Sequence, residues 1–214
     1  MTSENFEANS KDFLDLLKIA VECQINFVQI REKQLSARET FKLTVRAVKL
    51  TKKSETLLLV NDRADIALGA GADGVHLTSK SLAAAVIRGH FPRDFIVGVS
   101  THSGPEVLQA KQEKADFAIF GPMFTTPSKA RYNLPPQKLE TLHNVCEQAG
   151  DFPVLALGGI EKSNVAQIFN AGASGIAAIR FLAQPDDLPS NVDFIRNAWK
   201  TRRPIKFNQW LSQK

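Results

Sequence analysis

Short apolar segments alternate with longer segments of helical spacing along the sequence, and this alternation restricts the fold more than any other feature. Seven apolar runs, several of them rich in β-branched residues, predict strands at 27–30, 57–60, 74–77, 95–99, 117–120, 154–157 and 175–179. Both faces of each run are apolar, as a parallel sheet covered by helices requires. The segments between them predict helices at 37–52, 81–90, 105–113, 136–148 and 162–170, and a further helix at about 11–22 precedes the first strand. This order of strands and helices predicts an α/β fold.

Polar residues and glycines follow nearly every predicted strand, and their position decides between two α/β architectures. They are Arg31, Lys33, Asn61, Asp62, Ser100, His102, Gly121, Thr126, Gly158, Gly159 and Arg180. In a barrel the carboxyl ends of all strands form one ring, whereas an open sheet would spread these residues along an edge. We therefore predict a TIM (β/α)8-type barrel. Because no strand-like run precedes the helix at 11–22, the first barrel strand is expected to be missing or atypical.

The domain organisation follows from the absence of a linker rich in proline, glycine or serine. We expect one barrel domain over residues 1–214, with a core at about 13–182 and a C-terminal helix and tail at 183–214. The segments 69–75 and 170–176 resemble each other, and in both a glycine is placed to end a helix just before a strand. Each predicts a tight turn from helix to strand.

Composition argues against several classes of protein. The formal net charge is +5, which suits an anionic small molecule, but the basic residues are scattered apart from Arg202, Arg203 and Lys206, so no nucleic-acid partner is expected. No apolar run approaches the roughly 20 residues of a membrane-spanning helix, so no membrane partner is expected. Cys23 and Cys146 lack metal-ligand spacing and predict neither disulfides nor zinc, so the expected location is the cytoplasm.

Residues after the first two predicted strands carry the first candidate binding groups. Gln29, Arg31 and Lys33 share one side of the chain because strand residues two apart face the same way. Two cations and an amide suit a phosphate or diphosphate, although ordinary surface charges would have the same pattern. Asn61 and Asp62 could hold Mg²⁺ through oxygen ligands, or they could begin the following helix as caps.

Ser100 and His102 place a hydroxyl and an imidazole just beyond the predicted strand at 95–99. An imidazole with its ordinary pKa of about 6.5 can transfer protons near neutral pH, although a lone histidine is more often a surface or capping residue. His76, His90 and His143 are interpreted as strand, helix-end and helix-surface residues.

Two further segments predict anion binding. The polar loop at 121–129 could close its hydroxyls and lysine over an anion, or it could be a flexible turn-rich loop. The last two strand ends contain Gly158, Gly159 and Arg180. Barrels often build a phosphate site from these last two connections, although glycines there could merely permit tight turns.

Six segments carry a family resemblance when they are taken in order. They are QIREK at 29–33, NDRADIALGAGADGVHL at 61–77, GVSTHS at 98–103, FGPMFTTPSK at 120–129, ALGGI at 156–160 and GASGIAAIR at 172–180. Each motif is weak alone, but the ordered set at this spacing resembles the thiamine-phosphate synthase and thiazole tautomerase (TenI-like) superfamily over residues 13–182.

The resemblance implies a thiamine biosynthesis enzyme, thiamine-phosphate synthase, which couples hydroxymethylpyrimidine diphosphate with thiazole phosphate and releases pyrophosphate. It assigns the pyrimidine diphosphate to Gln29, Arg31, Lys33, Asn61 and Lys129, with Ser100 on the pyrimidine side. It assigns the thiazole phosphate to Thr126, Ser128, Gly159, Ile179 and Arg180. Asp62 matches one of the two Mg²⁺ carboxylates of the family.

Two departures from the family pattern keep alternatives open. Ser81 replaces the second metal carboxylate, with Lys80 beside it, and Arg180 replaces a small hydroxyl residue. A hydroxyl is a poorer Mg²⁺ ligand than a carboxylate, so a metal-independent tautomerase with His102 as acid and base is the alternative enzyme. A non-catalytic protein that binds thiamine precursors is the alternative of another class. The oligomeric state is left open, with a homodimer as one option.

Overall fold

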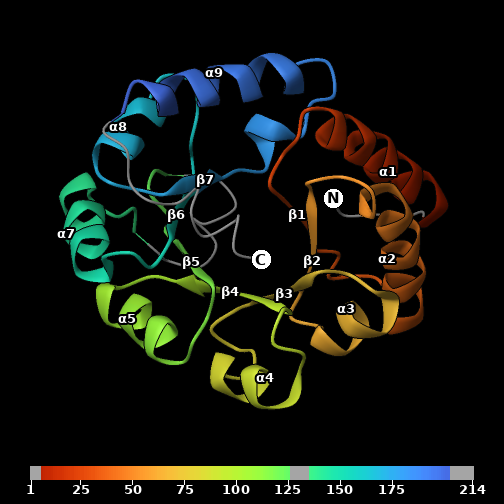
Figure 1. Ribbon diagram of the computed structural model, residues 1–214. Helices are drawn as coiled ribbons and strands as arrows, with labels where there is room; N and C mark the ends of the chain where they lie inside the picture. Colours follow the sequence, from red (N-terminus) through yellow and green to blue (C-terminus); the bar gives the residue numbers. More distant parts are fainter. Residues whose placement is uncertain (1–5, 126–134, 203–214) are drawn as a thin grey trace.

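The computed structural model describes residues 6–125 and 135–202, with side chains from Ser10 onward. Seven parallel strands form one sheet in the order in which they occur along the chain (Figure 1). They are β1 (Phe27–Ile30), β2 (Leu57–Asn61), β3 (Gly74–Leu77), β4 (Ile96–Thr101), β5 (Phe117–Phe120), β6 (Val154–Leu157) and β7 (Gly175–Ala177). All seven predicted strands are confirmed, but β4 continues two residues beyond its predicted end and so includes Ser100.

Helices lie outside the sheet (Figure 1), and those from α2 to α8 lie between consecutive strands, whereas α1 precedes β1 and α9 follows β7. They are α1 (Phe6–Glu22), α2 (Ala37–Thr51), α3 (Ala64–Ala70), α4 (Ala84–His90), α5 (Gly104–Gln112), α7 (Leu139–Ala149), α8 (Val165–Asn170), the 3-10 turn η1 (Arg180–Leu182) and α9 (Leu188–Lys200). All six predicted helices are found, although α4, α7 and α8 each begin three residues later than predicted. Among the described helices, none combines the length and apolarity that a bilayer crossing demands.

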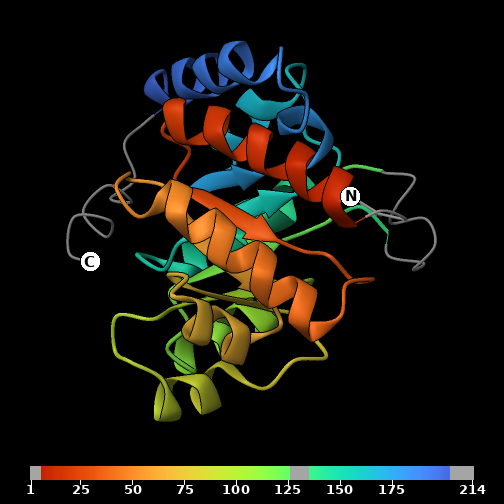
Figure 2. The ribbon, with the colours of Figure 1, turned by 90° about the vertical axis from the view of Figure 1, so that its right-hand side faces the viewer.

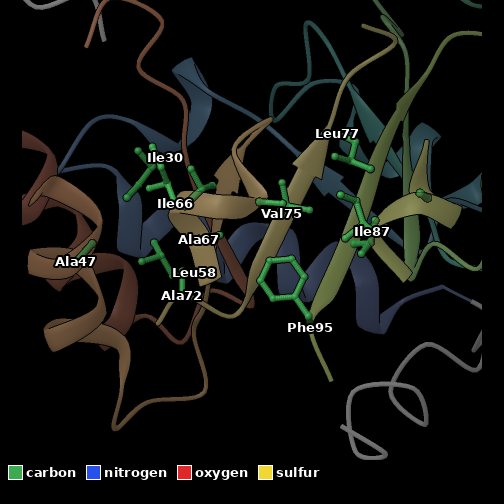
Figure 3. Close-up of a cluster of buried hydrophobic side chains, with 14 of the residues drawn as sticks. Ile30, Ala47, Leu58, Ile66, Ala67, Ala72, Val75, Leu77, Ile87 and Phe95 are labelled. Atoms are coloured by element: carbon green, nitrogen blue, oxygen red, sulfur yellow. The ribbon is translucent and has the colours of Figure 1, made fainter. Parts of the chain in front are cut away.

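The sheet curls, so alternate residues of each strand face either the interior or the surrounding helices. Leu59, Ile96, Phe117, Ile119 and Leu155 form the interior cluster. The intervening residues face outward, and Figure 3 shows Ile30, Leu58 and Val75 among side chains of α2, α3 and α4. Most strand residues are therefore apolar on both faces, which is why the strand sequences lack a regular polar alternation.

The curled sheet does not close on itself within the described residues. No hydrogen-bonded pairing joins β1 to β7, and no strand precedes α1 in the described part of the chain. Helices α1 and α9 lie side by side near this opening (Figures 1 and 2), and Ala20, Leu188 and Val192 form their buried contact. The Arg196 guanidinium of α9 also donates to the carbonyl of Cys23, at 2.8 Å. The expectation of a barrel without a regular first strand is thus confirmed, and the fold is a curled, TIM-like half-barrel.

Candidate active site at the carboxyl ends of the strands

Four polar side chains from β1 to β4 form two hydrogen-bonded pairs inside the curled sheet. The Nε2 group of Gln29 donates to Oδ1 of Asn61, at 3.0 Å. The Nε2 atom of His76 lies 3.2 Å from Oγ of Ser100. All four residues lie at inward positions of their strands, near the carboxyl ends. The sequence analysis predicted that Gln29, Asn61 and Ser100 would meet here, but it did not include His76.

The strand register explains how His76 is held. His76 is paired with Gly98, and Gly98 is paired with Phe117 on the next strand. Because a Cβ on Gly98 would lie 2.3 Å from Cζ of Phe117, the ring of Phe117 occupies the space that a side chain at 98 would need. That ring stacks on the imidazole, with centroids 6.3 Å apart and planes 16° apart. The sequence signal was a polar residue at an inward position of an otherwise apolar strand.

The imidazole of His76 is uncharged at neutral pH. It is 5% exposed. Burial, together with the positive charge of Arg31, lowers the pKa of His76 from its usual 6.5 to about 4. His76 lies on a strand, as predicted. It also belongs to the inward polar group formed with Gln29, Asn61 and Ser100.

Arg31 and Lys33 follow β1 and remain exposed to solvent. Within residues 10–125 and 135–202, neither side chain forms an ion pair with a carboxylate. Two exposed positive charges without an acidic partner among the described residues, just after the strand that holds Gln29, favour binding of an anion. Their position is consistent with the predicted grip on a phosphate or diphosphate.

Asp62 lies next to the polar group but does not cap a helix. Helix α3 begins after Arg63, and no side chain accepts a hydrogen bond at its start. The predicted capping role for Asn61 and Asp62 is therefore wrong, because Asn61 bonds Gln29 across the strands instead. The backbone of Asp62 is left-handed, with a φ of 62°, and its N–H donates to the carbonyl of His76 at 2.9 Å. This fixes the exposed carboxylate at the end of β2.

Ser81 is already engaged within a turn that follows β3. Its Oγ accepts from the backbone N–H of Thr78 at 2.7 Å and lies 3.1 Å from Oγ1 of the same threonine. In the described part of the chain, no three histidine, cysteine or acidic residues come together as a metal site. Asp62 alone suits a Mg²⁺ ion that substrate phosphates and water also coordinate, which is a common arrangement for this metal. It does not suit an ion held by protein ligands alone.

His102 lies just after β4, where its side chain bonds to the neighbouring strand. Its Nδ1 lies 2.5 Å from the carbonyl oxygen of Gly121, at the end of β5. A carbonyl can only accept, so Nδ1 carries the proton and Nε2 of the neutral ring has a free lone pair. Gln137, which the sequence analysis missed, donates from Nε2 to the carbonyl of His102 at 3.0 Å. The site thus contains a histidine of fixed orientation.

The loop after β6 packs closely against the segment after β5. Gly158 and Gly159 have φ values of 108° and 64°. A Cβ on Gly159 would lie 2.7 Å from Cβ of Phe124, so a side chain is excluded there. Asn164 donates from Nδ2 to the carbonyl of Gly159, at 2.9 Å. The glycines therefore have a packing role, and their predicted phosphate contact stays a prediction.

The remaining predicted residues lie at the end of β7 and in the loop after β5. Strand β7 ends at Ala177, two residues before its predicted end, so Ile179 lies beyond it and is 65% exposed. Arg180 begins the 3-10 turn η1. Thr126, Ser128 and Lys129 lie outside the described residues, and the predicted closure of their loop over an anion stays a prediction.

Comparison with known proteins identifies the family of this chain. The family model described as "Thiamine monophosphate synthase" matches residues 1–182. The thiamine-phosphate synthase of Caldicellulosiruptor bescii is 35% identical over 193 residues, covering 90% of this chain and 87% of that protein. The enzyme of the same name from Chlorobium phaeovibrioides is 40% identical over 160 residues, covering 75% of this chain and 76% of that protein.

A solved structure extends the likeness to three dimensions. The thiamine phosphate pyrophosphorylase of Pyrococcus furiosus superposes with a TM-score of 0.78 at 28% identity, covering 88% of this chain and 89% of that chain. The match includes the curled parallel sheet whose strand ends hold the two hydrogen-bonded pairs. The chain belongs to the thiamine monophosphate synthase family.

Proposed function

We propose that this chain is a thiamine-phosphate synthase that joins an aminopyrimidine-methyl diphosphate to a thiazole phosphate. The bond between the pyrimidine methylene carbon and the diphosphate oxygen breaks, and its electron pair leaves with pyrophosphate. The thiazole nitrogen then donates its lone pair to the methylene cation, which forms the new C–N bond without any change in oxidation state. The observation that carries the proposal is the inward polar group at 29, 61, 76 and 100, followed just after β1 by Arg31 and Lys33, which form no ion pair among the described residues.

The cations would act on the leaving diphosphate. Departure of pyrophosphate places further negative charge on its bridging oxygen, and fixed positive groups stabilise such charge more in the transition state than before it. Arg31 can donate two parallel hydrogen bonds to phosphate oxygens, whereas Lys33 supplies a compact charge. Lys129 is proposed as a third cation from the loop after β5. A Mg²⁺ ion bound by Asp62 and the diphosphate would neutralise further charge.

The paired side chains would hold the pyrimidine ring. Gln29 and Asn61 already bond to each other, which orients both side chains. Oε1 of Gln29 and Nδ2 of Asn61 would then be available to the ligand. Ser100 would contact the ring from the β4 side. On the opposite side, Thr126, Ser128, Gly159, Ile179 and Arg180 are proposed to hold the thiazole phosphate. The two bound organic molecules would also keep water away from the methylene cation of the pyrimidine.

The coupling reaction gives a direct test. Purified protein incubated with both substrates and Mg²⁺ is expected to release one pyrophosphate for each thiamine phosphate formed, measured by enzyme-coupled phosphate detection and by chromatography. The same mixture without the thiazole phosphate is the control, and it should release far less pyrophosphate. Absence of both products, in a protein with intact circular dichroism, would refute the proposal.

The orientation of His102 favours a second candidate function, isomerisation of a carboxylated thiazole phosphate. This reaction moves a proton between two carbons and needs a base that then returns the proton as an acid. The free Nε2 of His102 meets that requirement because Gly121 fixes the proton on Nδ1. If this activity exists, His102→Ala should lower its rate by about 10²- to 10⁴-fold and leave the coupling rate within a few fold. Equal isomerisation rates in the original protein and in His102→Ala would exclude His102 as the base.

We propose two further properties that follow from the assigned reaction. Residues 1–214 form one domain, with the small phosphorylated pyrimidine and thiazole as its partners. The cytoplasm is the proposed location, since both substrates are charged metabolites that do not cross membranes freely.

A further inference from the structure

The imidazole of His76 has one bonded nitrogen and one without a partner. Nε2 lies 3.2 Å from Oγ of Ser100. Nδ1 is buried from solvent and finds no hydrogen-bond partner among the described residues. The stacked ring of Phe117 fixes the plane of the imidazole, so the two nitrogens keep these different surroundings.

These surroundings decide which nitrogen carries the proton. The neutral ring has one N–H group and one bare nitrogen. A buried N–H without an acceptor is rarer and more costly than an acceptor that lacks a donor. The N–H group is therefore at Nε2, where Ser100 can accept it, and the bare nitrogen is Nδ1. The ring is neutral in this arrangement, because a charged ring would bury a second N–H at Nδ1, where no acceptor lies among the described residues.

The donor at His76 also determines the direction of the serine hydroxyl. When Oγ of Ser100 accepts from Nε2, the hydroxyl hydrogen has to point elsewhere. Ser100 is half-buried, at the inward carboxyl end of β4, and its side chain has no other hydrogen bond within the described ranges. The hydroxyl hydrogen is thus directed to whatever molecule occupies the site.

We infer that His76 is a positioning residue that holds Ser100 as a hydrogen-bond donor, so that the site selects a heteroaromatic ring with a nitrogen acceptor at this point. This inference rests on the proposed function for the identity of the ring, which is the pyrimidine. The aminopyrimidine has both an amino donor and ring-nitrogen acceptors. A serine whose hydroxyl hydrogen points into the site presents a donor to a ring nitrogen and so fixes the orientation of the ring.

The proton position can be measured without any substrate. Histidine labelled with ¹⁵N reports which ring nitrogen is protonated through its chemical shift, and loss of the signal in His76→Gln identifies the residue. We expect a protonated Nε2 and a bare Nδ1 at pH 7, unchanged when the pH is lowered to 6. A protonated Nδ1 would overturn the inference, whether or not the protein makes thiamine phosphate.

Binding of the pyrimidine diphosphate, measured by titration calorimetry, tests the consequence. His76→Leu and Ser100→Ala should each weaken binding about tenfold, and the double variant should be no weaker than either single variant. His76→Gln should bind within about twofold of the original protein, because its amide N–H can replace Nε2 as the donor.

Two results would contradict the role of His76 in binding. Additive losses in the double variant would show that the residues act separately, and equal losses in His76→Gln and His76→Leu would show that only ring packing matters. Failure of the original protein to bind the pyrimidine diphosphate would instead refute the proposed function, and the nitrogen shifts would still decide the inference.

Discussion

Arg31→Ala is expected to lower kcat/KM for thiamine phosphate formation by about 10²- to 10³-fold. The side chain follows β1, is exposed, and has no carboxylate partner among the described residues. Its positive charge contributes to lowering the pKa of the buried His76, and we propose that its guanidinium meets a diphosphate bound beside the polar pairs. Because charge develops on the leaving group as the C–O bond breaks, most of the loss should be in kcat rather than in KM.

Arg93→Ala is the matched control. Arg93 is exposed in the connection between α4 and β4, at the amino end of β4 and so at the opposite end of the barrel. It removes the same charge, and kcat/KM should stay within about twofold of the original value, as for a typical surface substitution. Arg31→Lys should retain part of the activity, since the charge remains and the paired donors are lost. Equal losses at positions 31 and 93 would mean that net charge, not local contact, matters.

The order of strands and helices could be predicted because each apolar run has both faces buried. The outward residues of the strands are buried against the helices and most of their inward residues are apolar, so the polar inward residues near the strand ends do not obscure the signal. The turns from helix to strand were also visible, since Gly71 and Gly172 have positive φ values. Element boundaries were harder to predict. Ser81 was predicted to begin the helix at 81–90. Its hydroxyl instead accepts a hydrogen bond from Thr78 within a turn, and α4 begins at Ala84.

The site was predictable as a set of strand ends but not as a set of contacts. Sequence spacing placed Gln29 and Asn61 at neighbouring ends, and only the register shows that they bond to each other. His76 was missed because its role depends on Gly98 of the adjacent strand, whose missing side chain admits Phe117. The sequence of β3 shows a polar residue at an inward position, but it does not show the contacts with β4 and β5 that hold this residue.

The turn that precedes β5 contains the most deeply placed ion pair among the described residues. The carboxylate of Asp116 bonds the guanidinium of Arg88 from α4, and these side chains are 10% and 16% exposed. Its Oδ2 atom also accepts from the backbone N–H of Val97, at 2.7 Å. Arg88 further donates to the carbonyls of Phe95 and Lys114, at 2.5 and 2.7 Å. The pair therefore connects α4, β4 and the start of β5.

Asp116→Asn is expected to lower the free energy of unfolding by about 3 kcal/mol, the lower end of the range for breaking a buried pair. The amide oxygen can still accept from the N–H of Val97, so the loss of stability reports the removal of the ion pair with Arg88. The measurement is urea unfolding at pH 7 followed by circular dichroism. Replacing both partners, as in Arg88→Met with Asp116→Asn, should recover part of the loss, because no unpaired guanidinium then remains buried.

Asp73 supplies the matched control because it occupies the same place two strand-helix units earlier, before β3. Its Oδ2 atom accepts from the backbone N–H of Leu58 at 2.7 Å, as Asp116 does from Val97, but no cation pairs with it in the described ranges. Burial raises the pKa of Asp73 above its usual 3.8, so its ionised form opposes folding as pH rises through that raised value. Asp73→Asn removes this cost and keeps the acceptor, so stability at pH 7 should not fall by more than about 0.5 kcal/mol. A loss at Asp73 equal to that at Asp116 would show that the backbone bond, not the ion pair, stabilises these turns.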